Sequence, residues 1–210
     1  MASSYAEQIP VIIHVIRAVA PKTILDIGKG FGKYAFLTHE YCGIPSIRRP
    51  LPSKTFADQS SIKIDAVEIN ESYLFPHIAQ LYNEVFIGRI QEVYKTLPRY
   101  DLILMVDIIE HLEKDIGRTI LRHFLNCSQI VLVATPKHFF QQELYESPHE
   151  HHISYWKVGD FKFDGHFVDY QNCYAGRVFL LSPSRIEIRG FGSSLIKRAR
   201  RIARALLNEF

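Results

Sequence analysis

The chain has 210 residues, of which 47% are hydrophobic and 22% are charged. This composition is typical of one globular domain with a full core, and it excludes a mostly disordered chain. The formal net charge is +3, but residues 193–210 carry five Lys and Arg against one Glu, which leaves −1 for the other 192 residues. The body is therefore not basic enough to predict general binding to nucleic acid.

Three cysteines, Cys42, Cys127 and Cys173, are an odd number and lack the spacing of a metal site. Such usage suits a reducing compartment better than a disulfide framework. The N-terminal stretch has no basic segment followed by a long apolar run, so we expect neither a signal peptide nor a transmembrane span. We therefore expect a cytoplasmic protein.

The predicted elements alternate between helix and strand. Residues 3–21 predict an amphipathic helix before the first strand, and helical spacing of apolar residues recurs later. Between the helices stand short β-branched runs that are apolar on both faces, as in a parallel sheet covered on both sides. The strands are expected at 23–27, 63–69, 84–88, 100–107 and 129–136, and the later helices at 31–40, 72–82 and 113–124. This order predicts an α/β, doubly wound, Rossmann-like fold.

The last part of the chain departs from this alternation. Residues 166–174 and 176–183 flank Ala175 and Gly176, which predicts an antiparallel hairpin and a mostly parallel sheet of seven strands. We expect a single domain over 1–192, in which the proline-rich residues 42–61 form an inserted loop. Residues 193–210 predict a basic amphipathic helix, which can lie on an anionic membrane or pack on its own domain or on a second copy.

Three glycines follow the first strand in the stretch ILDIGKGFGKY, and we name residues 28–32 the glycine loop. In an open α/β sheet, such a turn brings backbone N–H groups to a ligand beyond the carboxyl ends of the strands. The spacing fits neither a dinucleotide fingerprint, because Lys33 takes the place of its third glycine, nor a phosphate loop ending in GK[ST]. Asp26 before the loop would repel a pyrophosphate, so the pattern favours a cationic ligand.

Taken in order, DIGKGFG, AVEIN, YDLILMVDIIEHL and VLVATP resemble the class I S-adenosylmethionine-dependent methyltransferases over residues 10–183. Within that superfamily, GKGFGKYAFL, DIIEHL and SPHEHHISYW resemble a bacterial group of small methyltransferases linked to glycan or natural-product biosynthesis. The resemblance implies S-adenosyl-L-methionine as the cofactor and a small-molecule acceptor, with O-methylation of a sugar or natural-product hydroxyl as the leading reaction. N-methylation of a small amine and a non-catalytic scaffold of the same fold are the alternatives.

The resemblance also assigns roles around the cofactor. Gly28, Gly30 and Gly32 approach the methionyl part, and Asp26 its amino end. Glu68 takes the ribose hydroxyls, since a carboxylate accepts two hydrogen bonds.

By the same resemblance, the other cofactor positions lie at the ends of the later strands. Asn70 lies close to Glu68 in sequence. Arg89 stands where the family usually has an aspartate that faces the adenine amine, so this role passes to the backbone of Ile90 or to Gln91. Asp107 ends the fourth strand at the carboxyl edge and is counted with the cofactor-binding residues.

The chemistry would follow the fourth strand, where Asp107, Glu110 and His111 stand at positions i, i+3 and i+4. An imidazole can take a proton near neutral pH, and a neighbouring carboxylate can fix its tautomer, so His111 is a candidate base with Glu110 beside it. The same three residues could instead hold a divalent ion such as Mg²⁺, as a similar arrangement does in quinone-pathway O-methyltransferases. A third interpretation is that Glu110 and His111 only cap the next helix.

A second group of histidines lies in SPHEHHISYW, residues 147–156. Adjacent ligands cannot wrap one ion tetrahedrally, so a closed zinc site is not expected. By the resemblance, Pro148, Glu150, His152, Ser154 and Trp156 form a loop over the substrate. His152 is therefore the second candidate base, and a packed loop anchored by Trp156 is the alternative.

Overall fold

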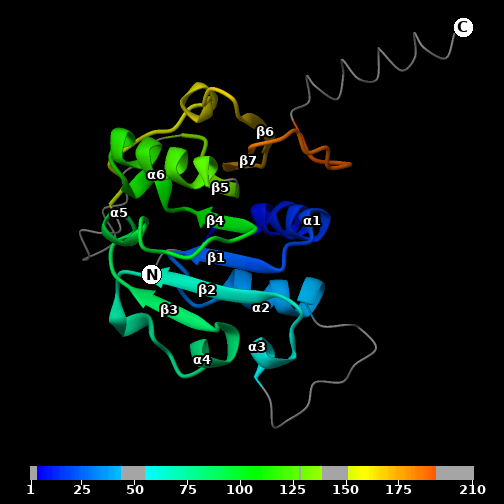
Figure 1. Cartoon of the computed structure of the whole chain (residues 1–210). Helices are drawn as coiled ribbons and strands as arrows, with labels where there is room; N and C mark the ends of the chain where they lie inside the picture. Colours follow the sequence, from blue (N-terminus) through cyan, green and yellow to red (C-terminus); the bar gives the residue numbers. More distant parts are fainter. Residues whose placement is uncertain (1–3, 44–54, 128, 139–150, 193–210) are drawn as a thin grey trace, which may run out of the picture.

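The structure is a computed structural model that describes residues 4–43, 55–127, 129–138 and 151–192. Its centre is a seven-stranded sheet in the order β3-β2-β1-β4-β5-β7-β6 (Figure 1). The strands are Thr23–Ile27 (β1), Lys63–Glu68 (β2), Glu84–Ile87 (β3), Leu102–Val106 (β4), Ile130–Pro136 (β5), Phe167–Asn172 (β6) and Gly176–Ser182 (β7). The strands β1 to β5 pair in parallel, and β7 is antiparallel to both β5 and β6. The predicted Rossmann-like sheet and its C-terminal hairpin are confirmed.

Several helices that connect the strands are short, and three of them have only four residues. They are Ile9–Val19 (α1), Lys33–Thr38 (α2), Phe56–Gln59 (α3), Ile78–Leu81 (α4), Ile90–Val93 (α5) and Lys114–Asn126 (α6). Short 3-10 turns cover Ala6–Gln8, Glu71–Tyr73, Ile109–His111 and Val158–Phe161, and a π-helical turn covers His39–Gly43. The predicted N-terminal helix is confirmed as the turn at Ala6–Gln8 followed by α1.

The predicted helix over 72–82 is wrong in its first half. A 3-10 turn ends at Tyr73, and α-helix begins only at Ile78. Pro76 explains the break, because it removes a backbone donor and disfavours helical dihedrals at Phe75 before it. This leaves residues 74–77 outside both helical segments, with a turn at Pro76 and His77 on the surface beside the glycine loop.

Two apolar layers cover the two faces of the sheet. Alternate strand residues such as Ile24, Ile64 and Leu104 pack with α1, α2 and α4 on one face. Their neighbours, such as Leu25 and Ile103, pack with α6 on the other. Because successive side chains of a strand point to opposite faces, a run that is apolar at every position buries both.

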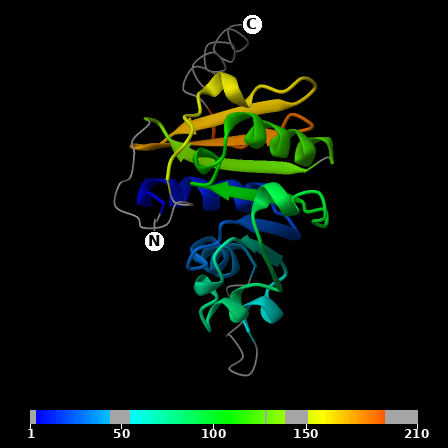
Figure 2. The same cartoon turned by 90° about the vertical axis from the view of Figure 1, so that its left-hand side faces the viewer.

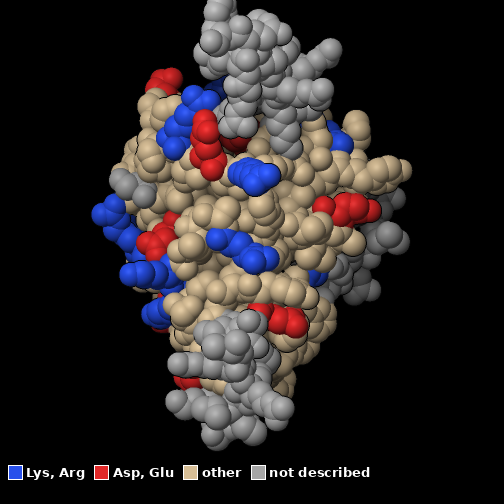
Figure 3. Space-filling model, turned by 90° about the vertical axis from the view of Figure 1, so that its right-hand side faces the viewer, with Lys and Arg blue, Asp and Glu red and all other residues tan. Residues whose placement is uncertain are grey.

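Parts of the predicted insertion and tail lie outside the described residues. Of the insertion at 42–61, the structure describes residues 42, 43 and 55–61, which include the one-turn helix α3. The predicted basic helix at 193–210 is not among the described residues. Among those that are, no helix combines the length and apolar character that crossing a membrane requires. On the face in Figure 3, charged residues of both signs are scattered over a larger uncharged surface.

Candidate functional site

A cleft of about 770 Å³ opens at the carboxyl ends of the parallel strands. Figure 1 shows the arrowheads of these strands on one side of the sheet, and Figure 2 turns that side toward the viewer. The walls come from segments distant in sequence: residues 4–5, the glycine loop, and the turns after β2, β3 and β4. Residues 151–153, which precede the C-terminal hairpin, complete the lining.

The glycine loop needs glycine for conformation and for space. Gly28 has φ +71°, and a Cβ there would lie only 2.0 Å from Cδ1 of Ile108. Gly32 has φ +77° and precedes the first residue of α2. The backbone N–H of Gly28 donates to the carbonyl oxygen of Val67 at 2.8 Å, which fixes the loop to β2. Gly28 and Gly30 line the cleft, whereas Gly32 packs against Ile78, Leu81 and Tyr82. The approach of the three glycines to a methionyl group stays a prediction.

Asp26 lies within β1 at the floor of the cleft and is 3% exposed. Its Oδ2 accepts a hydrogen bond of 2.6 Å from the hydroxyl of Tyr82. Burial raises the pKa of Asp26 to about 6, and the charge of Glu68 adds to this, while the Tyr82 bond and the charge of Lys29 oppose it. Burial disfavours the charged form of Asp26, and a cationic group of a ligand beside it would stabilise that form.

Glu68 ends β2 and is 4% exposed. Its Oε2 accepts from the backbone N–H of Gly30 at 3.3 Å, and its Oε1 accepts from that of Asn70 at 3.0 Å. Asn70 thus lies beside Glu68, and its own side chain caps the next turn by accepting from Ser72. Glu68 therefore joins the glycine loop to the turn after β2.

The wall after β3 contains the residue that departs from the family pattern. Arg89 is exposed and directly precedes α5, and it lines the cleft together with the buried Ile90 and with Gln91. Recognition of adenine by the backbone of Ile90 or by Gln91 stays a prediction.

Asp107 directly follows β4 and has a left-handed conformation, with φ 52°. Both of its carboxylate oxygens are buried, and neither has a hydrogen-bond partner among the described residues. Gln8 approaches closely enough to lower the pKa of Asp107, yet the pair does not reach hydrogen-bond geometry. Burial dominates and raises the pKa to about 7, and the charge of Lys33 opposes that rise. A strained, unpaired carboxyl group at a cleft is a common sign of a functional position.

Glu110 lies one turn further and is 2% exposed. One carboxylate oxygen accepts a bond of 3.1 Å from the hydroxyl of Thr135 on β5, and the other has no partner among the described residues. Burial, followed by the charge of Asp107, raises the pKa of Glu110 well above its ordinary value.

His111 and His152 meet above Glu110. Their rings are edge to face with centroids 4.9 Å apart, and Nδ1 of His111 is 3.0 Å from the carbonyl oxygen of His151. A carboxylate oxygen of Glu110 and one nitrogen of each ring all lie within 4.8 Å of one another. The structure thus joins two residues of the predicted ion site with His152, and Asp107 lies outside that set.

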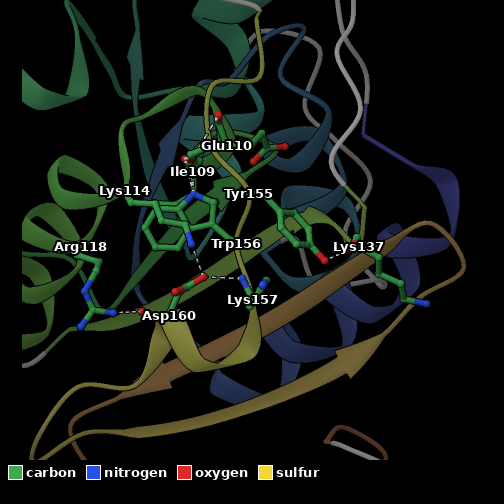
Figure 4. A network of polar contacts seen from close by, with 10 residues as sticks. Ile109, Glu110, Lys114, Arg118, Lys137, Tyr155, Trp156, Lys157 and Asp160 are labelled. Carbon is green, nitrogen blue, oxygen red and sulfur yellow. Dashed lines mark hydrogen bonds and ion pairs between the residues drawn. The ribbon is translucent and has the colours of Figure 1, made fainter.

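The segment that carries His152 is anchored to the turn after β4. The backbone N–H groups of Ile153 and Ser154 both donate to the carbonyl oxygen of Glu110, at 2.9 and 3.0 Å. Trp156 is fully buried, and its Nε1 donates to the carbonyl oxygen of Ile109 at 2.9 Å (Figure 4).

Figure 4 shows a second anchor, in which Asp160 accepts from Lys114 of α6 at 2.8 Å and from the backbone of Lys157 at 2.7 Å. The predicted anchoring by Trp156 and the predicted place of His152 at the cleft therefore occur together. The predicted loop residues Pro148 and Glu150 lie outside the described residues.

Several residues in the cleft or next to its lining were not singled out from the sequence. Lys29 stands inside the glycine loop, Tyr82 donates to Asp26 from just after α4, and Gln8 lies close to Asp107. Lys33 donates to the hydroxyl and carbonyl oxygens of Ser4, at 2.9 and 3.3 Å. A charged residue between two glycines was the one local signal, since the other contacts join distant parts of the chain.

The sequence matches no family model and no curated protein. Among solved structures, the chain is similar to the methyltransferase domain of bacterial CtHen1-C, with a TM-score of 0.56 and 16% identity over 85% of this chain and 98% of that one. It is also similar to the N-terminal domain of EvdMO1 with SAH bound, with a TM-score of 0.58 and 12% identity over 87% and 83%. A third similar structure is a putative caffeoyl-CoA O-methyltransferase from Staphylococcus aureus. Its TM-score is 0.52, with 15% identity over 86% of this chain and 85% of that one. The chain has the Rossmann-like fold of methyltransferases.

Proposed function

We propose that this chain is an S-adenosylmethionine-dependent methyltransferase that methylates a hydroxyl of a small-molecule acceptor, such as a sugar or a natural product. One observation carries the proposal. A single cleft holds the glycine loop with Asp26 and Glu68 at one end, and Glu110, His111 and His152 at the other. The first group suits a cationic nucleoside cofactor, and the second suits removal of a proton from the acceptor.

Methyl transfer from a sulfonium is an in-line displacement, so the protein mainly has to align the acceptor with the methyl group and exclude water. The glycine loop supplies close backbone contact, Asp26 faces the amino end of the cofactor, and Glu68 accepts from the ribose hydroxyls. A hydroxyl acceptor must also lose its proton. His111 and His152 lie at the cleft for this step, and the carbonyl oxygen of His151 holds Nδ1 of His111.

The same cluster fits a divalent ion, and we propose this as a second form of the site. The unpartnered oxygen of Glu110 and the close ring nitrogens of His111 and His152 provide one carboxylate and two imidazole ligands. Such a mixed set suits Mn²⁺ or a later transition metal better than Mg²⁺, which prefers oxygen ligands. When bound, the ion would lower the pKa of an acceptor hydroxyl.

Calorimetric titration of the purified chain with S-adenosylmethionine, S-adenosylhomocysteine and NAD tests the cofactor. We expect binding of the first two and none of NAD. If neither S-adenosylmethionine nor S-adenosylhomocysteine binds, the methyltransferase proposal fails and a scaffold role takes its place. Repeating the titration with Mn²⁺ and with Mg²⁺ separates the two forms of the site.

The acceptor class needs its own assay, because N-methylation of an amine is the rival reaction. Release of S-adenosylhomocysteine can be followed with matched pairs of acceptors that carry a hydroxyl or an amine on the same sugar. Turnover of the hydroxyl members alone is the expected result. Turnover confined to the amines would replace O-methylation with N-methylation.

A further inference from the structure

Lys29 is a buried cation inside the glycine loop. Its side chain is 5% exposed, and its Nζ donates to the carbonyl oxygen of Tyr73 at 2.7 Å and to that of Gly30 at 3.3 Å. Burial lowers the pKa of Lys29, and the charges of Glu68 and Asp26 oppose this effect. Burying an ammonium group is costly, so a lysine at this position needs a compensating role.

The partner of Lys29 belongs to residues 69–77, which we name the outer wall. Ile69, Asn70 and Tyr73 of this segment line the cleft. None of the residues of its 3-10 turn is buried, and Pro76 prevents it from joining α4 as one helix. The outer wall therefore gains little stability from the core and depends on contacts with its neighbours.

Besides the bond from Lys29 to Tyr73, two sets of contacts tie the outer wall to the glycine loop, one of them through Glu68 at its base. Glu68 accepts from both Gly30 and Asn70. Phe31 stacks on Phe75 with ring centroids 4.7 Å apart, and its carbonyl oxygen is 3.0 Å from Nε2 of His77.

Of these contacts, the aromatic one is open to solvent, since Phe31 is 51% exposed and His77 is also exposed. The hydrogen bond from Lys29 to Tyr73 differs from the others, because its donor is charged and buried and its acceptor lies in the middle of the outer wall. Hydrogen bonds to charged groups stabilise more than neutral ones, and more so when water is excluded.

We propose that Lys29 is a positioning residue, which holds the outer wall against the nucleoside half of the cofactor site through the carbonyl oxygen of Tyr73. It acts through Tyr73 and not by contact with the reacting atoms. This proposal rests on the proposed function, because the nucleoside is that of S-adenosylmethionine.

Lys29→Met tests the proposal, because methionine keeps much of the apolar stem and removes the donor. The matched control is Lys22→Met, which changes an exposed lysine just before β1, at the opposite end of that strand. Each protein is titrated with S-adenosylhomocysteine and with 5′-methylthioadenosine, which has the nucleoside but lacks the amino-acid part. We expect Lys29→Met to weaken both ligands by the same factor of about ten, and Lys22→Met to weaken neither. Unchanged affinities, or a loss for S-adenosylhomocysteine alone, would overturn the proposal.

Hydrogen exchange without ligand tests the tie itself. In Lys29→Met, amides of residues 69–77 should exchange faster than in the unaltered chain, while those of β4 should not change. Lys29→Arg retains donors and should recover part of the protection. Equal exchange in the outer wall of all three proteins would refute the role of Lys29. If the unaltered chain binds neither nucleoside ligand, the proposed function fails, but this comparison still decides whether Lys29 holds the outer wall.

Discussion

The rings of His111 and His152 meet edge to face at the cleft, 4.9 Å apart, although the two residues follow different strands of the sheet. Because the imidazoles are the groups best suited to take the acceptor proton, His111→Ala and His152→Ala should each lower turnover by about 10²- to 10⁴-fold. The affinity for S-adenosylhomocysteine should stay within about twofold, since neither ring belongs to the proposed cofactor end. His166→Ala, which lies outside the cleft lining, is the control. Unaltered turnover in both cleft variants would reject the assignment.

Glu110 provides the test for an ion. Glu110→Gln keeps the shape of the side chain but removes the charged ligand, so Mn²⁺ affinity measured by calorimetry should fall at least about tenfold. Glu113→Gln changes an exposed carboxylate three residues away and should bind Mn²⁺ as the unaltered chain does. If the unaltered chain does not bind Mn²⁺ at all, the proton must be taken directly by a histidine.

Asp26 should oppose stability at high pH. Its pKa rises from 3.8 in the unfolded chain to about 6 in the folded one. The folded state therefore binds this proton more tightly, and the resulting stability is complete below pH 3.8 and is lost as the pH rises through 6. A shift of that size corresponds to about 3 kcal/mol. Asp26→Asn should thus unfold at higher urea concentration than the unaltered chain at pH 8, with an advantage that shrinks as the pH falls toward 4. A constant difference across this range would contradict the assignment.

The same variant should lose the cofactor. An amide cannot offer a negative charge to the amino end of the methionyl group, so we expect Asp26→Asn to bind S-adenosylmethionine at least about tenfold more weakly. Calorimetry at pH 8 measures this. Tight binding by a more stable Asp26→Asn protein would show that Asp26 serves the fold alone.

Gly117 allows the indole of Trp156 to lie against α6. A Cβ at this position would come within 2.7 Å of Cζ2 of Trp156, whereas a Cβ at Gly159 would meet nothing within 4 Å. Gly117→Ala should therefore lower the free energy of unfolding by about 1–3 kcal/mol through overpacking. Gly159→Ala should leave it nearly unchanged. Urea denaturation of both variants decides, and equal stabilities would contradict the packing described for Trp156.

The basic residues at 193–210 remain a prediction from sequence. If they bind an anionic membrane, a version that ends at Gly192 should sediment less with vesicles of anionic lipid than the full chain does, and salt should weaken the difference. Equal sedimentation of the two proteins would favour packing on the domain or on a second copy. Light scattering distinguishes these two, because only packing on a second copy raises the measured mass.

The sheet was predictable because its strands carry a strong local signal. The run LILMV is apolar at every position, and TILDI is apolar at Ile24, Leu25 and Ile27; such runs arise where both faces are covered. The apolar spacing over 72–82 predicts one continuous helix, but Pro76 breaks it. Its break is what leaves the outer wall free to lie on the glycine loop.

The site was predictable one strand end at a time. Asp26, Glu68 and His111 each follow a recognisable local pattern, and parallel strands bring their carboxyl ends together. The contact between Tyr82 and Asp26 joins residues that are 56 positions apart in the sequence, and the contact between Lys29 and Tyr73 joins residues that are 44 positions apart. No local pattern specifies such pairs, so the closeness of His152 to Glu110 and the role of Lys29 needed the structure.

The strand order divides the cleft between two parts of the chain. Apart from Asp107 after β4, the groups assigned to the cofactor lie in or after β1, β2 and β3, whereas those assigned to the acceptor follow β4 or belong to residues 151–153 after β5. Substitutions among residues 151–153 should therefore change the acceptor part of the cleft and leave the affinity for the cofactor unchanged. A library that randomises residues 151 and 153 would then be a direct route to altered acceptor choice, and cofactor affinity could serve throughout as the check that each member is intact.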